Sequence, residues 1–208
     1  MESNKNILAS IDSLILLIDE ENKYAEIYLM GVSMGSVYAL ASAMNDSTAS
    51  HLAGLILIGS PLRVHRSQIV HFDNISCIFP LIFNRKRPFL YLDGRRLESS
   101  VNDQEYIDAR RNDSLSIHYI SMDYLLKVRK IQRECKRKSA LSSISLPVLI
   151  IHGGNDKISS IRGAYFLNRN LVNSRRELLI YPNSRHSVFW DSDSVKVVRD
   201  LVNWISSK

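Results

Sequence analysis

The pentapeptide Gly31-Val32-Ser33-Met34-Gly35 stands between a short apolar stretch, residues 25–30, and a run of small residues, 36–44. The first stretch favours a β-strand and the second a helix, so the sequence predicts strand, tight turn and helix in that order. In a Gly-x-Ser-x-Gly turn the serine takes a strained backbone conformation, which requires that the residues two before and two after it lack bulky side chains. We therefore expect Ser33 to project from the end of the strand, with the two glycines making room.

Apolar periodicity extends this pattern along the chain. Further buried strands are predicted at residues 54–59, 147–152 and 177–181. Helical spacing of apolar residues is found at residues 7–20, 161–172 and 195–205. Near-continuous apolar strands that alternate with helices are typical of a parallel sheet covered on both faces. We expect an α/β fold with a mostly parallel sheet and flanking helices.

A long interval separates the second and third predicted strands. It is too long for a simple crossover and favours an inserted subdomain. We therefore expect three parts, a core part at residues 1–61, a mostly helical insertion at 62–140 and a second core part at 141–208. Within the insertion, residues 117–131 are predicted to form an amphipathic helix, and residues 75–83 form an apolar cluster.

The positive charge of the chain is concentrated in this insertion. The whole chain has 27 Lys and Arg against 21 Asp and Glu, and residues 61–140 hold 16 of the former and 9 of the latter. A solvated helical surface is the simplest interpretation, and attraction to an anionic membrane surface or an acidic substrate is the second. No nucleic-acid partner is expected, because the basic residues are not interleaved with aromatic platforms or zinc ligands.

The same sequence argues against an integral membrane protein. Its apolar runs fall far short of the ~20 residues that a helix needs to cross a bilayer. Residues 1–6 lack the basic and apolar stretches of a secretory signal, and we expect a cytoplasmic protein. Cys77 and Cys135 show no metal-ligand spacing, and we expect both to be packing residues and not a disulfide.

A serine hydroxyl becomes an effective nucleophile beside a base, and the base needs a carboxylate to orient it. Asp156 follows the third predicted strand and His186 follows the fourth. Loops after parallel strands emerge at one edge of the sheet, so Ser33, Asp156 and His186 are expected to share one crevice. The alternatives are that Asp156 caps the following helix and that His186 is an exposed turn residue. The remaining histidines are expected to be structural: His51, His65, His71, His118 and His152.

The order Ser, Asp, His and its surrounding motifs resemble the α/β-hydrolase superfamily, in particular serine hydrolases of the lysophospholipase or monoacylglycerol-lipase type. The resemblance rests on residues 31–35, on Leu-Pro-Val-Leu-Ile-Ile-His-Gly-Gly-Asn-Asp at 146–156 and on Asn-Ser-Arg-His at 183–186. It implies that Ser33 is the nucleophile, Asp156 the acid and His186 the base, with a helical lid in the place of the insertion.

The resemblance also implies a reaction. Carboxylic esters would be cleaved through an acyl-enzyme, without a metal or organic cofactor. The helix that starts at the serine turn points its first amides toward an oxyanion formed there, so the Met34 amide is the expected donor of the oxyanion hole. The same triad serves amide or thioester hydrolysis, and that alternative stays open.

The chain departs from the family before its first predicted helix. Only six residues stand where family members carry four strands and a loop that supplies a second oxyanion donor. From this we expect a truncated reading frame, a diverged remnant, or a fragment completed by another polypeptide that covers the exposed edge of the strand at 25–30. Losing one oxyanion donor lowers turnover by about 10² to 10³ fold, so both a weak esterase and a non-catalytic binding module are consistent with the sequence.

Overall fold

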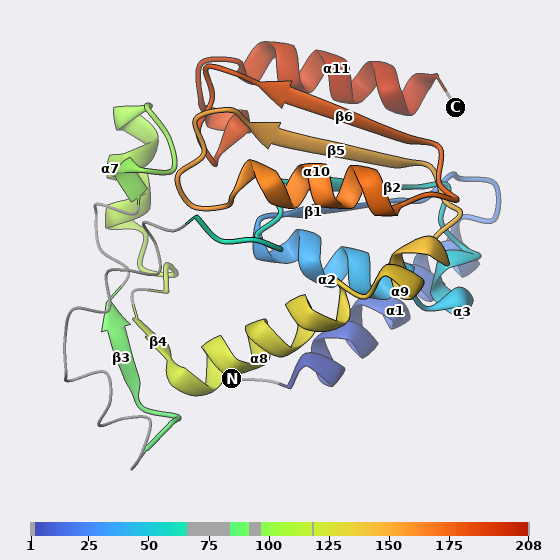
Figure 1. The fold of residues 1–208 in the computed structure, drawn as a ribbon, viewed down its shortest axis with the longest axis horizontal. Helices are drawn as coiled ribbons and strands as arrows, with labels where there is room; N and C mark the ends of the chain where they lie inside the picture. The colour runs from blue at the N-terminus through green and yellow to red at the C-terminus, as the bar shows by residue number, and fades with distance from the viewer. Residues whose placement is uncertain (1–2, 66–83, 92–96, 118, 208) are drawn as a thin grey trace.

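A computed structural model describes residues 3–65, 84–91, 97–117 and 119–207, and its main feature is a four-stranded parallel sheet (Figure 1). The strands lie in the order β1-β2-β5-β6. Their bounds are β1 Tyr28–Val32, β2 Gly54–Ile58, β5 Val148–Gly153 and β6 Arg176–Tyr181. Every residue of β2 and β5, the two central strands, is buried. The predicted α/β fold with a parallel sheet is confirmed.

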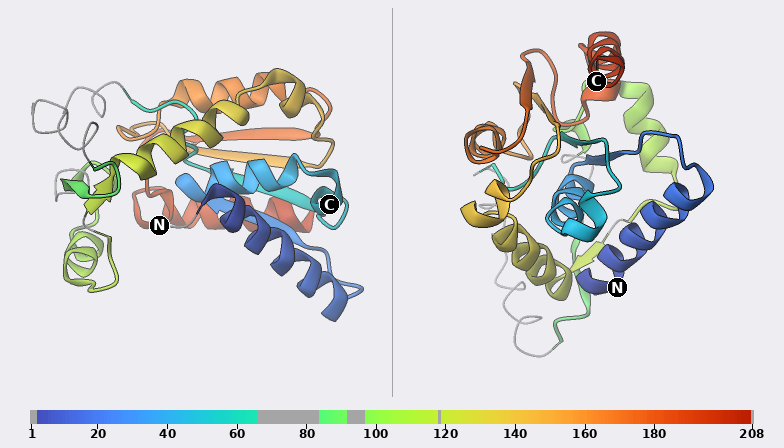
Figure 2. Two further views of the ribbon diagram at one scale, coloured as in Figure 1. Left: turned by 90° about the horizontal axis from the view of Figure 1, so that it is seen from below. Right: turned by 90° about the vertical axis from the view of Figure 1, so that its right-hand side faces the viewer.

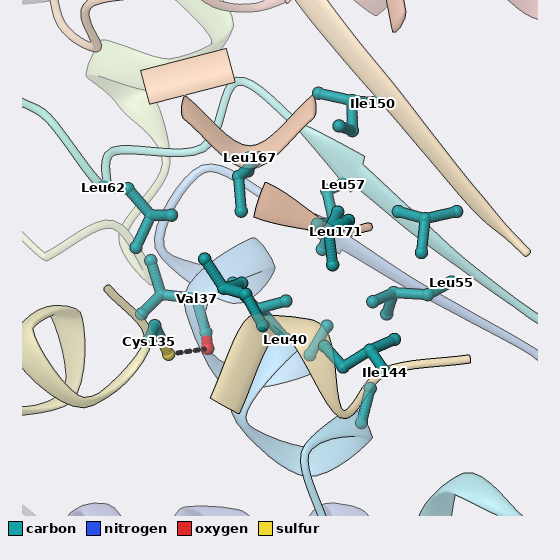
Figure 3. Close-up of a cluster of buried hydrophobic side chains, with 14 of the residues drawn as sticks. Val37, Leu40, Leu55, Leu57, Leu62, Cys135, Ile144, Ile150, Leu167 and Leu171 are labelled. Carbon is teal, nitrogen blue, oxygen red and sulfur yellow. Dashed lines mark hydrogen bonds between the residues drawn. The ribbon is translucent and has the colours of Figure 1, made fainter. Parts of the chain in front are cut away.

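Helices lie on both faces of the sheet (Figures 1 and 2). Alternate residues of β2 separate the two layers, since Leu55 and Leu57 belong to one apolar cluster and Ile56 and Ile58 to another. The first cluster includes side chains of α2 and α10 and is drawn in Figure 3, and the second includes side chains of α11. These helices span α2 Met34–Ala43, α10 Ile161–Asn170 and α11 Ser194–Ser206.

The N-terminal helix packs on α2 through only part of its apolar surface. Ile7, Leu8 and Ile11 of α1 (Asn4–Glu21) pack against the first cluster. Its other leucines are largely exposed: Leu14 at 55%, Leu16 at 43% and Leu17 at 50%. A short helix, α3 (Asp46–Ala49), follows α2. Among the described residues, none of the helices combines the length and the apolar character that crossing a bilayer would require.

Strand β1 lies at the edge of the sheet and starts later than predicted. A backbone hydrogen bond from Ala25 to Asn22 closes a turn, so the strand begins at Tyr28 and not at residue 25. Within the residues that the structure describes, β1 pairs with β2 alone. Met30 and Val32 are 48% and 39% exposed, which matches the apolar edge expected from the sequence.

The insertion contains strands as well as helices. β3 (Pro88–Tyr91) pairs antiparallel with β4 (Tyr119–Ser121), a pair that the sequence analysis did not predict. The helix predicted at residues 117–131 is therefore wrong at its start, because residues 119–121 form β4. Its helical part begins at Met122, where the Ser121 hydroxyl accepts a hydrogen bond from the Tyr124 amide. Among its described residues are the helices α7 Gln104–Asn112, α8 Met122–Glu134 and α9 Lys138–Ser142.

Helix α8 joins the insertion to the core. The Ile131 side chain and Cys135 directly after the helix are fully buried in the first cluster, and the Cys135 thiol donates a hydrogen bond to the Val37 carbonyl at 3.5 Å (Figure 3). Burial raises the pKa of this thiol to about 12, so Cys135 stays protonated and acts in packing, as expected. Cys77 and the apolar cluster at residues 75–83 lie outside the described residues.

Candidate active site

Ser33 sits in a strained turn between β1 and α2. Its backbone φ is 52°, the one positive value found for a non-glycine residue in the described parts of the chain. A Cβ at Gly31 would lie 2.5 Å from the Gly35 carbonyl oxygen, so this position accepts only glycine. A Cβ at Gly35 would meet nothing within 4 Å. The expected steric requirement therefore holds at Gly31, whereas at Gly35 the space around the Cβ position is open.

The turn brings Ser33 to the edge of the sheet at which β5 and β6 also end. The His186 Nε2 atom lies 2.7 Å from the Ser33 hydroxyl oxygen, and His186 Nδ1 lies 2.7 Å from Asp156 Oδ2. The structure thus places all three residues in one continuous hydrogen-bonded chain, although they are 123 and 30 residues apart in sequence. Asp156 does not cap α10, and His186 is buried, so neither structural alternative describes these two residues.

The Asp156 carboxylate is held from both of its oxygens. Oδ1 accepts hydrogen bonds from the backbone amides of Ile158 at 2.7 Å and Ser159 at 2.9 Å. Oδ2 accepts hydrogen bonds from His186 and from the Ser159 hydroxyl. Burial works to raise the Asp156 pKa, but the hydrogen bonds and the neighbouring histidines outweigh it and hold the pKa below its usual value. Asp156 is therefore ionised at neutral pH and oriented toward the imidazole.

Sequence reasoning missed two residues beside this carboxylate. Ser159 is fully buried and contacts Asp156, and His152, expected to be structural, lies with Nε2 3.9 Å from Asp156 Oδ2. Spacing offered a weak signal, since Ser159 comes three residues after Asp156 and His152 four residues before it. Of the other histidines, His51 binds Asp19 at 2.7 Å, His65 donates its backbone amide to Ile158, and His71 and His118 lie outside the described residues.

Two serines therefore contact His186, and their exposure distinguishes them. The Ser159 oxygen lies 3.3 Å from His186 Nδ1, but none of Ser159 is exposed. Ser33 is partly exposed and faces Nε2, the nitrogen that can take up a proton while Nδ1 stays bonded to Asp156. A substrate carbonyl can reach Ser33 and not Ser159.

The first residue of α2 completes the geometry at the turn. Met34 begins this helix, so its backbone amide is one of the four that have no partner within the helix itself. Amides at a helix N-terminus favour negative charge. The arrangement thus combines a hydroxyl, a base, a carboxylate and an anion-stabilising amide, which is the set required for acyl transfer.

A family model described as serine aminopeptidase S33, Hydrolase_4, matches residues 1–193, where S33 is the family's name and not a residue number. The chain belongs to this family. The resemblance to α/β-hydrolases of the monoacylglycerol-lipase type that the sequence suggested is thereby confirmed.

Curated relatives of this chain are monoglyceride lipases or their homologues. The rat monoglyceride lipase is 23% identical over 186 residues, which cover 88% of this chain and 59% of the relative. A monoglyceride lipase homolog of monkeypox virus is 24% identical over 185 residues, which cover 88% of this chain and 63% of the relative. This chain therefore spans about three fifths of the length of these relatives.

Solved structures show the same fold. A soluble variant of the Saccharomyces cerevisiae monoglyceride lipase, in complex with a substrate analog, superposes with a TM-score of 0.85 at 19% identity, covering 100% of this chain and 70% of that one. A thermostable carboxyl esterase of Bacillus coagulans, in complex with glycerol, superposes with a TM-score of 0.75 at 17% identity, covering 100% and 73%.

Proposed function

We propose that this protein is a serine hydrolase of carboxylic esters, of the monoacylglycerol lipase, lysophospholipase or carboxylesterase type. The observation that carries the proposal is the chain of two 2.7 Å hydrogen bonds from Ser33 through His186 to Asp156. The names of the relatives, monoglyceride lipases from animals, a yeast and a virus homologue, support acyl esters of glycerol as the substrate class. We propose glycerol esters as the substrates on the strength of these names. We also propose the cytoplasmic location that the sequence predicts.

The reaction would proceed in two halves. In the first, the Ser33 oxygen attacks the ester carbonyl carbon while His186 takes the hydroxyl proton, and the Met34 amide stabilises the negative charge on the carbonyl oxygen. The carbon–oxygen bond to the alcohol then breaks, and His186 returns the proton to the leaving alcohol. In the second half, water attacks the acyl-enzyme with His186 again as the base, releasing the acid. Asp156 remains ionised and holds the imidazole throughout.

A fluorophosphonate probe tests this assignment without requiring fast turnover. We expect the folded wild-type protein to be labelled covalently, and Ser33→Ala to abolish the labelling. His186→Gln should slow labelling by about 10³ fold or more, because the hydroxyl loses its base. Ser174→Ala, which removes a buried hydroxyl bonded to the Ile144 carbonyl, is the matched control and should label normally.

The second candidate is a non-catalytic binding module, and the same probe distinguishes it. Absence of labelling in wild-type protein, with a cooperative unfolding transition that proves it folded, would support the binding module. One oxyanion donor, Met34, is assigned, and the expected rate is accordingly low. Hydrolysis of p-nitrophenyl butyrate should therefore be followed before the steady state, where formation of the acyl-enzyme releases a burst of p-nitrophenol.

We also propose that the insertion docks on an anionic membrane surface. Leu115, Ile117 and Tyr119 are 90%, 64% and 54% exposed at the start of β4. A hydrogen bond from the Asp123 amide to the Arg85 carbonyl joins the exposed basic turn at 85–87 to the start of α8. Exposed basic residues continue along and beyond α8: Arg129, Lys130, Arg133, Arg137 and Lys138. Apolar side chains beside basic ones are suited to an interface with anionic headgroups.

Vesicles of mixed anionic and zwitterionic lipid test the membrane proposal. Lys130→Glu with Arg133→Glu should weaken binding by about 30 fold or more at low salt and less at high salt, because each basic residue near the surface contributes about 1 kcal/mol and the added carboxylates are repelled by anionic lipid. Leu115→Ser should weaken binding at both salt concentrations. Equal binding of wild type and the charge-reversed variant would reject a role for this surface.

Finally, we propose that a partner chain covers the exposed edge of β1. The exposed Met30 and Val32 on the strand and Leu14 and Leu17 on α1 support this proposal. An apolar edge strand is a template for pairing with another strand.

A further inference from the structure

Two further side chains lie beside the Asp156 carboxylate, the hydroxyl of Ser159 and the imidazole of His152. The Ser159 hydroxyl donates to Asp156 Oδ2, the same oxygen that accepts the His186 Nδ1–H bond at 2.7 Å. Ser159 Oγ also lies 3.3 Å from His152 Nε2. Side chains of Ser159, His152 and Asp156 are all at least nine-tenths buried, so water does not compete for these contacts.

The protons of this cluster can be assigned from its partners. His152 Nδ1 lies 2.8 Å from the Gly153 carbonyl oxygen, and a carbonyl only accepts, so Nδ1 carries the ring proton. Burial lowers the pKa of His152 more than the nearby Asp156 raises it, and the ring is neutral at neutral pH. His152 Nε2 therefore presents a lone pair to Ser159. The single Ser159 hydroxyl proton faces two acceptors, Asp156 Oδ2 and His152 Nε2.

We propose that Ser159 is a positioning residue that shares Asp156 Oδ2 with His186 and so weakens the hydrogen bond between His186 and Asp156, and that His152 acts on this bond through Ser159. An oxygen that accepts two hydrogen bonds offers less charge to each donor. When the Ser159 proton points to Oδ2, the His186 bond is weakened. When it points to His152, Oδ2 is released to His186. The proposal deepens the proposed function and rests on it for the catalytic meaning of that bond.

Proton NMR of the His186 Nδ1–H group measures this bond directly, because the resonance moves downfield as the bond shortens. We expect Ser159→Ala to move it downfield, since Oδ2 then serves His186 alone. His152→Leu should move it upfield, since the Ser159 proton then has Oδ2 as its remaining acceptor. The double variant should match Ser159→Ala, because the 3.9 Å between His152 Nε2 and Asp156 Oδ2 is too long for a hydrogen bond, so His152 acts on that oxygen through the hydroxyl. Assignment uses loss of the resonance in His186→Gln, and Ser174→Ala is the control for a lost buried hydroxyl.

A structural role alone would not give shifts of opposite sign that fail to add. An unchanged or upfield resonance in folded Ser159→Ala, or additive shifts in the double variant, would overturn the proposal. If Ser159→Ala does not fold, Ser159→Cys replaces the hydroxyl with a weak donor of similar size and should give the same downfield direction. Fluorophosphonate labelling of the same samples is the separate measure for the proposed function: labelled Ser33 without the shifts rejects only the inference, and the shifts without labelling reject only the hydrolase.

Discussion

Two glycines flank Ser33 in the sequence motif, but the space around their Cβ positions differs in the structure. At Gly31 an added methyl group would lie 2.5 Å from the Gly35 carbonyl oxygen and 2.5 Å from the Ser36 Cα, both of which are backbone atoms that cannot move alone. At Gly35 the added group enters open space. The turn therefore depends on the first glycine for its shape.

We predict that Gly31→Ala destabilises the protein by about 3 kcal/mol and lowers fluorophosphonate labelling by more than 10 fold, because the turn must open to relieve the clash. Gly35→Ala should change the free energy of unfolding by less than about 1 kcal/mol and keep labelling within a few fold. Denaturant titration and labelling kinetics measure both variants. Equal damage from the two substitutions would contradict the assigned geometry.

Asp156 links the site to the pH dependence of stability. Its pKa is lowered in the folded protein, so the carboxylate stabilises the fold above the pKa of the unfolded chain, and this contribution is lost as the pH falls through the folded value. We predict that the free energy of unfolding falls more between about pH 6 and about pH 3 in wild type than in Asp156→Asn, because the asparagine side chain has no proton to gain. This range is chosen because the usual pKa of Asp is ~4. Urea titrations across this range measure the slopes; parallel slopes would contradict the prediction.

The residues that the sequence could predict are those fixed by topology. Parallel strands end at one edge, so residues after β1, β5 and β6 were expected to meet, and the structure brings Ser33, Asp156 and His186 together. Ser159 and His152 could not be predicted in the same way. Their contacts with Asp156 depend on the path of the loop after β5 and on which ring nitrogen faces inward, and residue spacing encodes neither.

At the scale of elements, the periodicity of apolar residues predicted the strands whose position depends on their own sequence. Strands β2 and β5 are buried on both faces, and their continuous apolar runs located them to within about a residue. The β3–β4 pair was missed because its partners, Tyr91 and Tyr119, are brought together by the fold and lie in sequences without clear alternation. The start of β1 was misplaced because a turn at residues 22–25 takes up the first residues of the apolar stretch.

The edge strand β1 offers a test at this scale. Met30 is 48% exposed, whereas its neighbour Leu29 packs against the first cluster. We predict that Met30→Lys leaves the free energy of unfolding within about 0.5 kcal/mol and reduces self-association, because a lysine on an edge strand opposes strand pairing. Leu29→Lys, the matched control, should destabilise by about 2 kcal/mol or more. Light scattering and denaturant titration measure both, and unchanged association of Met30→Lys would contradict an open edge.

At the scale of the whole molecule, the insertion and the core share one hydrophobic cluster. The Gln132 side-chain amide donates to the Pro61 carbonyl at 2.6 Å, directly linking α8 to the loop after β2. Ile131 and Cys135 are buried among side chains of α2 and α10. A segment that shares its hydrophobic core with the sheet loses much of its stability when the sheet unfolds. Residues 62–140 differ from the rest in composition, but we expect them to unfold together with the sheet.

We therefore predict that the described parts of the chain unfold in a single transition and that Ile131→Ala lowers the stability of all of them together, by about 2 to 4 kcal/mol, through the cavity it leaves at a fully buried site. Far-ultraviolet circular dichroism reports all helices, including those of the insertion. Fluorescence of Trp204 on α11 reports the opposite face of the sheet, and it is measured in a Trp190→Phe background because Trp190 stacks on Tyr106 of the insertion. Both signals should shift to lower denaturant by the same amount, because α8 touches the core that supports α11 through the sheet. Leu126→Ala on the same helix is the control, since Leu126 is 41% exposed and should cost less than about 1 kcal/mol. If Ile131→Ala moved the circular dichroism signal alone, the insertion would unfold independently and the shared cluster would not couple it to the sheet.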